Sequence, residues 1–110
     1  MKSLPKNRPN QRKEEEEAKS LREEVLATGL NPLFLWRRRH NLSRVELAAI
    51  AGTNVNTIEK VEGGYYKTIS QRLLLTLHDR AGIPYELAAA YLVWRNLLAE
   101  RAREKVKDRD

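Results

Sequence analysis

The feature that most constrains the fold is a pair of short helices predicted within residues 43 to 62. Ser43 and Glu46 form a Ser-x-x-Glu capping box, in which each side chain accepts a hydrogen bond from the backbone amide of the other residue. Gly52 is suited to end this helix, and Asn54 can cap the free amides of the next one. Two consecutive glycines then stop the second helix. The sequence therefore predicts two short helices joined by a three-residue turn that contains glycine.

Similar signals predict helices on both sides of this pair. Asn31 can cap a helix that has Pro32 in its first turn, and Asn41 can adopt the left-handed conformation of a helix stop. The other predicted helices are an acidic amphipathic one at 14–30, one from about Thr68 or Ser70 to Ala81, and a long one from Pro84 to about 107. No run alternates apolar and polar residues as a strand does, so the expected fold class is all-α.

Composition excludes several classes of functional site. The chain has no cysteine, which excludes disulfides, thiolate metal sites and cysteine nucleophiles. His40 and His78 lie far apart with no acidic cluster near either, so we expect no metal and no cofactor. Because the chain also lacks a histidine-carboxylate cluster and a phosphate-binding loop, we do not expect an enzyme. No run of about eighteen apolar residues occurs, so we expect no membrane association and a cytoplasmic location.

Positive charge is concentrated at the amino terminus and in the middle of the chain. Lysine and arginine together number 21 against 15 aspartates and glutamates, a net charge of +6. Residues 1–13 hold five basic residues, no acidic ones and two prolines, so we expect a flexible basic arm. This arm either adds nonspecific attraction to phosphates or enters a groove of DNA. The charge distribution favours a polyanionic partner.

A specific resemblance adds to this picture. Leu42 to Gly64 read LSRVELAAIAGTNVNTIEKVEGG, which resembles the helix-turn-helix of the lambdoid phage repressors and Cro proteins, also called the XRE family. The resemblance extends over about residues 32–90. It implies a lambda-repressor-like five-helix DNA-binding domain, here with an extra amino-terminal helix and an extended carboxy-terminal helix. The expected organisation is the basic arm at 1–13, the acidic helix at 14–30, the helix-turn-helix domain at 31–90 and the carboxy-terminal helix extension at 91–110.

The resemblance places the second helix of the pair in the major groove of DNA, with its amino-terminal residues at the base edges. It implies base contacts by Asn54, Val55, Asn56 and Lys60. An asparagine suits adenine, a lysine suits guanine, and a valine suits the methyl group of thymine. Two interpretations of Glu59 remain open, since it either accepts a hydrogen bond from cytosine or only orients Lys60 or Asn56.

A second set of residues is expected to contact DNA phosphates, again by resemblance. These residues are Arg44, Thr57, Tyr66, Lys67, Ser70 and Gln71. Arg44 stands in the first turn of the first helix of the pair, where its guanidinium is expected to face the sugar-phosphate backbone. For Tyr66, packing within the loop is an equal alternative.

The resemblance also implies one structural ion pair, between Arg37 and Glu62, which we therefore exclude from the DNA contacts. Apolar residues at helical spacing are expected to form the core. They are Leu33, Trp36, Leu47, Ile58, Val61, Leu73, Leu77 and Leu87. Phe34 and Ile50 are expected to face inward as well.

The long carboxy-terminal helix carries an apolar stripe. Leu87, Tyr91, Trp94 and Leu98 recur at heptad spacing, and the first half of this stripe is expected to pack on the domain itself. Trp94 and Leu98 need a further partner, either the helix that bears Leu21 and Val25 or a second subunit. We favour a dimer, with Tyr91, Trp94 and Leu98 as possible contacts.

The sequence thus predicts a sequence-specific DNA-binding transcriptional regulator, acting as a repressor or autoregulator. Its expected partners are double-stranded DNA and a second copy of the chain. The alternative is an antitoxin or another interaction protein, which binds its own operator and blocks a partner protein through its tails.

Overall fold

The computed structural model describes residues 21–109, with side chains as far as residue 105. Within this range the regular secondary structure is entirely helical, which confirms the expected all-α class. The predicted basic arm at 1–13 and the first part of the predicted acidic helix lie outside the described residues.

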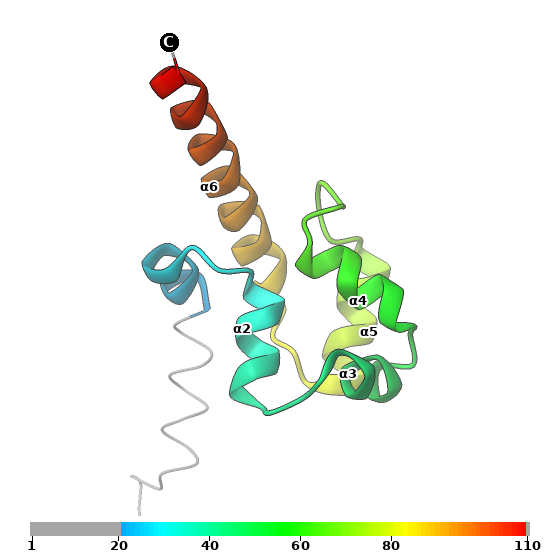
Figure 1. Cartoon of the computed structure of the whole chain (residues 1–110). Helices are drawn as coiled ribbons and strands as arrows, with labels where there is room; N and C mark the ends of the chain where they lie inside the picture. The colour runs from blue at the N-terminus through cyan, green and yellow to red at the C-terminus, as the bar shows by residue number, and fades with distance from the viewer. Residues whose placement is uncertain (1–20, 110) are drawn as a thin grey trace, which may run out of the picture.

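Helices follow one another along the described chain and are joined by short connections (Figure 1). Residues 21–28 are helical. They are followed by α2 (Pro32–Arg39), α3 (Arg44–Ala51), α4 (Val55–Glu62), α5 (Gln71–Ala81) and α6 (Glu86–Arg109). The last helix has 24 residues, and its carboxy-terminal part projects beyond the other helices (Figure 1).

Each helix start from α2 to α5 is capped by a side chain that the sequence offers for this purpose. The Oδ1 atom of Asn31 accepts hydrogen bonds from two backbone amides at the start of α2. The capping box of α3 is complete. The Ser43 amide donates to Glu46 Oε1 at 2.7 Å, and the Glu46 amide donates to the Ser43 hydroxyl at 3.0 Å. Asn54 caps α4 and Ser70 caps α5. The predicted helix starts at residues 31, 43 and 54 are therefore confirmed.

Two helix ends depend on a left-handed backbone conformation. Asn41, just after the α2 cap, has a φ of 54°, and Gly52 at the end of α3 has a φ of 70°. Asparagine and glycine tolerate this region better than other residues do. Both helix ends were predicted from the sequence.

The core is one cluster to which all the helices contribute. Leu33, Trp36, Leu47, Ile58, Val61, Leu77 and Leu87 are buried in it, as predicted. Leu73 and Phe34 are only partly buried. The prediction for Ile50 is wrong, because its side chain is 44% exposed. Helix α3 buries Leu47, Ala48 and Ala51 instead, and Ile50 lies about 100° around the helix from Ala51.

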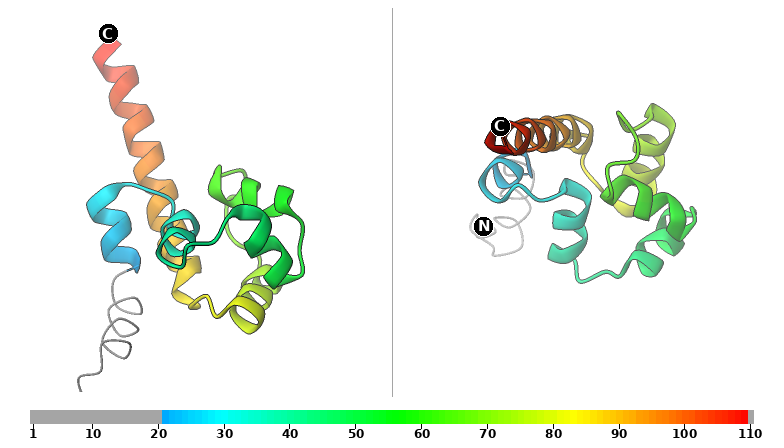
Figure 2. Two further views of the ribbon diagram at one scale, coloured as in Figure 1. Left: turned by 60° about the horizontal axis from the view of Figure 1, so that its bottom comes forward. Right: turned by 45° about the horizontal axis from the view of Figure 1, so that its top comes forward.

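The helix of residues 21–28 lies beside α6 in every view (Figure 2). Its residues Leu21 and Val25 are completely buried. An ion pair of 3.2 Å between Arg22 and Glu86 joins the two helices. This helix is therefore part of the folded unit and covers one side of α6.

The apolar stripe on α6 is buried within the chain as far as Trp94. Tyr91 is fully buried and Trp94 is 6% exposed, while Leu98 remains 38% exposed. The prediction that Tyr91 and Trp94 face a second subunit therefore needs correction. Their partners are in the same chain: the aromatic ring of Trp94 packs on Gly64, and the hydroxyl of Tyr91 bonds to the loop between α4 and α5.

Candidate functional site

Helices α3 and α4 are joined by residues 52–54 and pack on each other. The small residue Ala48 is buried on the α3 side, and Ile58 and Val61 are buried on the α4 side. The opposite face of α4 is open to solvent. Asn54, Asn56 and Glu59 are exposed, and Val55, Thr57 and Lys60 are partly exposed. The structure thus brings Asn54, Asn56 and Lys60 onto the accessible side of α4, whereas Val55, the fourth predicted base contact, packs against the core.

Asn54 has a structural role that limits what it can bind. Its Oδ1 atom accepts hydrogen bonds from the backbone amide of Thr57, at 2.9 Å, and from the Thr57 hydroxyl, at 3.1 Å. No hydrogen bond of the Asn54 side-chain nitrogen is found within the described part of the chain. A ligand could therefore use the donor end of Asn54, whereas Asn56 offers both ends of its carboxamide.

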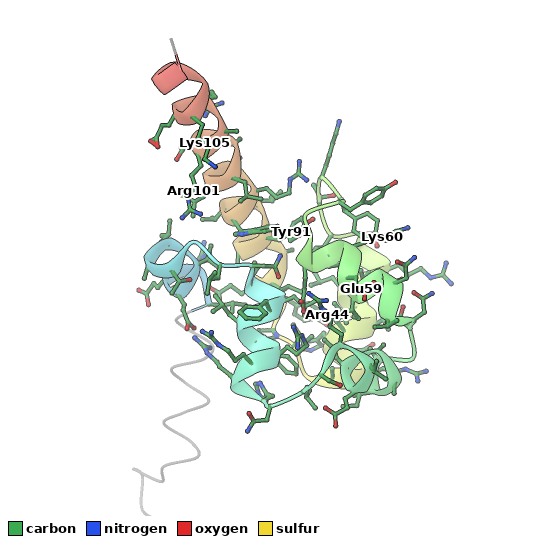
Figure 3. All side chains as sticks on the ribbon, in the orientation of Figure 1. Arg44, Glu59, Lys60, Tyr91, Arg101 and Lys105 are labelled. Atoms are coloured by element: carbon green, nitrogen blue, oxygen red, sulfur yellow. The ribbon has the colours of Figure 1, made fainter. Side chains whose placement is uncertain are left out.

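Lys60 is positioned by an aromatic ring that the sequence analysis did not select. Its ammonium lies 5.0 Å from the centroid of the Tyr65 ring, within the range of a cation–π contact. Tyr65 is 72% exposed and stands edge-on to Tyr66, with ring centroids 5.5 Å apart. Figure 3 shows Glu59 and Lys60 on the same helix, α4. The exposed ring of Tyr65 thus extends the accessible surface of α4 into the loop that follows it.

Tyr66 faces the interior instead. Its side chain packs against the core, and its carbonyl oxygen accepts hydrogen bonds from the Tyr91 hydroxyl, at 2.6 Å, and from Arg95, at 2.9 Å. Of its two predicted roles, the structure shows the packing role. The position of Tyr65 in a loop directly before a second tyrosine is the sequence signal that could have pointed to it.

Arg95 and Tyr91 anchor the α4–α5 loop to α6. Arg95 also donates a hydrogen bond to the carbonyl of Gly64. Burial raises the pKa of the Tyr91 hydroxyl above its usual value of 10.0, so this group stays protonated and continues to donate at neutral pH. Two donors from α6 therefore fix the loop that carries Tyr65.

Of the other predicted phosphate-contacting residues, Thr57 lies on α4, partly exposed and with its hydroxyl bonded to Asn54, and three lie in the loop before α5 or at its start. Lys67, Ser70 and Gln71 are exposed. The Ser70 hydroxyl accepts a hydrogen bond of 3.1 Å from the amide of Leu73, so it caps α5 while remaining at the surface. Lys67 has no ion pair among the described residues.

The predicted ion pair between Arg37 and Glu62 is confirmed. Arg37 Nε donates to Glu62 Oε2 at 2.7 Å, and Arg37 Nη2 donates to Glu62 Oε1 at 3.0 Å. The Glu62 side chain is 3% exposed. Hydrogen bonding to this carboxylate raises the pKa of Arg37. Arg37 also donates to the carbonyl of Leu42, so the pair ties α2 to the end of α4 and to the start of α3.

Arg44 belongs to the same cluster, which the sequence analysis did not foresee. Its Nε atom donates to Glu62 Oε1 at 3.1 Å, while its side chain is 47% exposed. The expectation that Arg44 acts as a phosphate contact alone therefore needs correction. Its guanidinium is oriented by a buried carboxylate, and its exposed part remains accessible to an anion.

No protein-family model, curated protein or solved structure matches the chain. Among residues 21–109, none of the helices has the length and apolarity needed to cross a bilayer.

Proposed function

We propose that the chain is a sequence-specific DNA-binding transcriptional regulator, a repressor or autoregulator with a lambda-repressor-like domain, that inserts α4 into the major groove. The observation that carries this proposal is the two-sided character of α4. Ile58 and Val61 fix one face in the core, and Asn54, Asn56 and Lys60 lie on the accessible face or its edge. A major groove admits one α-helix, and asparagine and lysine side chains pair with base edges there.

Cationic and polar groups near the carboxy-terminal end of α4 are available for backbone contacts, since Arg44 bonds to Glu62, the last residue of the helix. Lys67 and Gln71 are exposed beyond the carboxy-terminal end of α4, and the half-exposed Arg44 lies at the start of α3. Contacts of this kind to phosphates set the position of a recognition helix without reading sequence. Glu59 is exposed among these groups, and its carboxylate limits the approach of phosphates at that point.

The experiment that tests the proposal is selection of bound duplexes from a random DNA pool by the full chain. A sequence-specific binder enriches a defined motif, and the motif then serves as the probe in quantitative binding. Asn56→Ala is expected to weaken binding to the motif by about 1 to 3 kcal/mol and to leave binding to random DNA nearly unchanged.

A matched control is available on α6. Asn96 is an exposed asparagine away from the proposed recognition surface, so Asn96→Ala should leave both affinities unchanged. Recovery of no motif from the pool, or equal losses for Asn56→Ala on the motif and on random DNA, contradicts readout by α4.

A further inference from the structure

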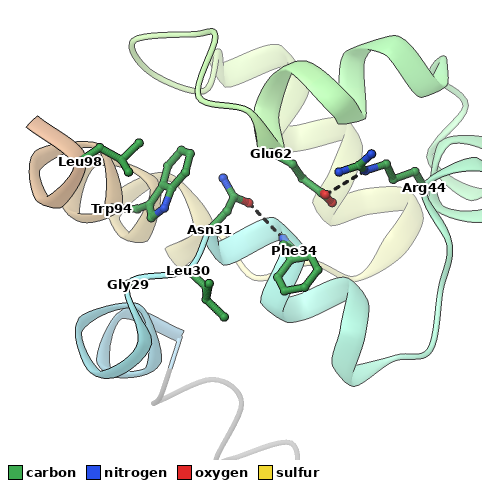
Figure 4. A pocket seen from close by; sticks show the side chains of 8 residues that line it. All are labelled: Gly29, Leu30, Asn31, Phe34, Arg44, Glu62, Trp94 and Leu98. Carbon is green, nitrogen blue, oxygen red and sulfur yellow. Dashed lines mark hydrogen bonds and ion pairs between the residues drawn. The ribbon is translucent and has the colours of Figure 1, made fainter. Parts of the chain in front are cut away.

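A groove opens between the Gly29–Asn31 connection, α2, α6 and the α3–α4 pair (Figure 4). Its volume is about 320 Å³. This volume falls at the lower end of the range of small-molecule sites, which is roughly 300 to 1,000 Å³. The groove is thus large enough for a compact ligand of low molecular mass.

The upper walls of the groove are apolar and accessible. Leu30 and Leu98 both line it, and each is 38% exposed. The buried Trp94 and the partly buried Phe34 complete the apolar surface. Side chains from three separate segments therefore offer apolar contact area that the folded chain itself leaves uncovered.

The side of the groove across from Trp94 and Leu98 carries excess positive charge (Figure 4). Arg44 and Glu62 line it, and Glu62 is shared between the guanidinium groups of Arg44 and Arg37. Two cations thus face one carboxylate. Arg44 is 47% exposed, whereas Glu62 is 3% exposed, so the group that a ligand meets is the cation.

Two more arginines stand next to lining residues. The guanidinium of Arg38 lies 5.1 Å from the centroid of the Phe34 ring. The guanidinium of Arg101 packs directly against Gly29. Glu62 is the only acidic residue among those that line the groove, and it is already doubly paired. The electrostatic environment therefore favours an anion and disfavours a cation.

We infer that this groove binds a small amphipathic anion, with its acidic group at Arg44 and its apolar body between Leu30 and Leu98. The acidic group gains charge-assisted hydrogen bonds from a guanidinium that is already oriented by Glu62. The apolar body covers leucine surface that is otherwise in water. This site shares Arg44 with the proposed phosphate contacts but includes none of the base-contacting residues of α4, and its test uses no DNA.

The test compares three probes with the same eight-carbon body: octanoate, 1-octanol and octylammonium. Binding to the full chain is followed by NMR through the indole N–H of Trp94, with the indole of Trp36, which does not line the groove, as an internal control. Octanoate is expected to shift the Trp94 signal with a dissociation constant of about 1 mM. Octanol is expected to bind about fivefold more weakly, and octylammonium more weakly still.

Two leucines of α6 provide matched variants. Leu98→Asp places a carboxylate in the groove and should weaken octanoate at least about tenfold. Leu92→Asp makes the same change at a residue that is 45% exposed and does not line the groove, and it should leave octanoate binding unchanged. Arg44→Gln should weaken octanoate but not octanol.

Three results overturn the inference. One is the absence of any Trp94 shift at about 10 mM octanoate. Another is equal affinity for octanoate and octanol, which assigns the groove to a neutral apolar group such as a side chain of another protein. The third is an equal effect of Leu98→Asp and Leu92→Asp, which places the octanoate elsewhere. None of these results bears on DNA binding by α4, so the two proposals fail separately.

Discussion

Glu62 is a single residue that joins three helices of the fold. Its carboxylate accepts hydrogen bonds from Arg37 on α2 and from Arg44 on α3, and its side chain is 3% exposed. Glu62→Ala leaves the largely buried guanidinium of Arg37 without its counterion. Loss of one partner of a buried pair costs about 3 kcal/mol or more. In a domain of this size we expect the melting temperature to fall by about 10 °C or more, as measured by circular dichroism.

The matched control is Glu59, an exposed glutamate one turn earlier on α4. Glu59→Ala should change the melting temperature by no more than a few degrees, because no buried cation depends on this residue. If the Glu62→Ala and Glu59→Ala proteins have the same melting temperature, the ion pair does not stabilise the fold.

The two tyrosines of the α4–α5 loop have opposite expected roles. Tyr66→Ala removes a side chain that packs on the core, so it should lower the free energy of unfolding by about 2 kcal/mol. Tyr65→Ala removes a ring that is 72% exposed and lies beside Lys60, so stability should be unchanged. If α4 binds DNA as proposed, Tyr65→Ala should weaken binding by about threefold to tenfold. Denaturant unfolding and DNA titration of both variants test these roles. A larger loss of stability for Tyr65→Ala than for Tyr66→Ala contradicts them.

At the scale of whole elements, the contact between the α4–α5 loop and α6 can be isolated with two glycines. Gly64 and Gly82 have nearly the same φ, 78° and 77°. A Cβ atom at Gly64 would lie 3.1 Å from the ring of Trp94, whereas one at Gly82 meets nothing within 4 Å. Alanine at either site therefore has the same backbone cost, and only Gly64→Ala adds a steric conflict with α6.

We expect Gly64→Ala to be more destabilising than Gly82→Ala by about 1 to 3 kcal/mol in denaturant unfolding. The difference between the two variants measures the packing of the loop on Trp94, because the backbone term cancels. Equal losses of unfolding free energy for the two variants indicate that the loop can move away from α6 at no cost in free energy.

The helix boundaries could be predicted because their causes are local. A cap at Ser43 or Asn54 and a stop at Gly52 depend on residues within four positions, which the sequence displays directly. Which face of a short apolar helix becomes buried depends on neighbours that are distant in sequence. The error at Ile50 has this origin, since α3 has apolar residues around much of its surface and the positions of α4 and α5 decide which are covered.

At the scale of the whole molecule, the same limit applies to α6. Heptad spacing identified Tyr91, Trp94 and Leu98 as one stripe, but spacing alone does not distinguish a second subunit from a segment of the same chain. In the structure the α4–α5 loop contacts Tyr91 and Trp94, while Leu98 remains partly exposed. The ion pair of Arg37 and Glu62 could be predicted only from the resemblance, and the third member, Arg44, followed from neither the spacing nor the resemblance.

The net charge of +6 raises the question of whether attraction to DNA comes from the whole molecule or from particular contacts. Lys67 is exposed beside the proposed recognition surface, and Lys105 is exposed on the projecting part of α6 (Figure 3). Lys67→Gln and Lys105→Gln change the net charge equally. A lysine that neutralises one phosphate releases counterions, so its loss reduces the slope of log affinity against log salt by about one unit.

We expect Lys67→Gln to flatten this slope on the selected motif and on random DNA alike. Lys105→Gln should leave the slope unchanged, because a charge farther from the phosphates than the Debye length of about 8 to 10 Å is screened. The measurement is titration of the full chain and both variants with duplex DNA between about 50 and 200 mM salt. Equal flattening by the two substitutions means that the overall field, and not a contact beside α4, holds the phosphates. A larger effect of Lys105→Gln moves the DNA-binding surface to the carboxy-terminal end of α6.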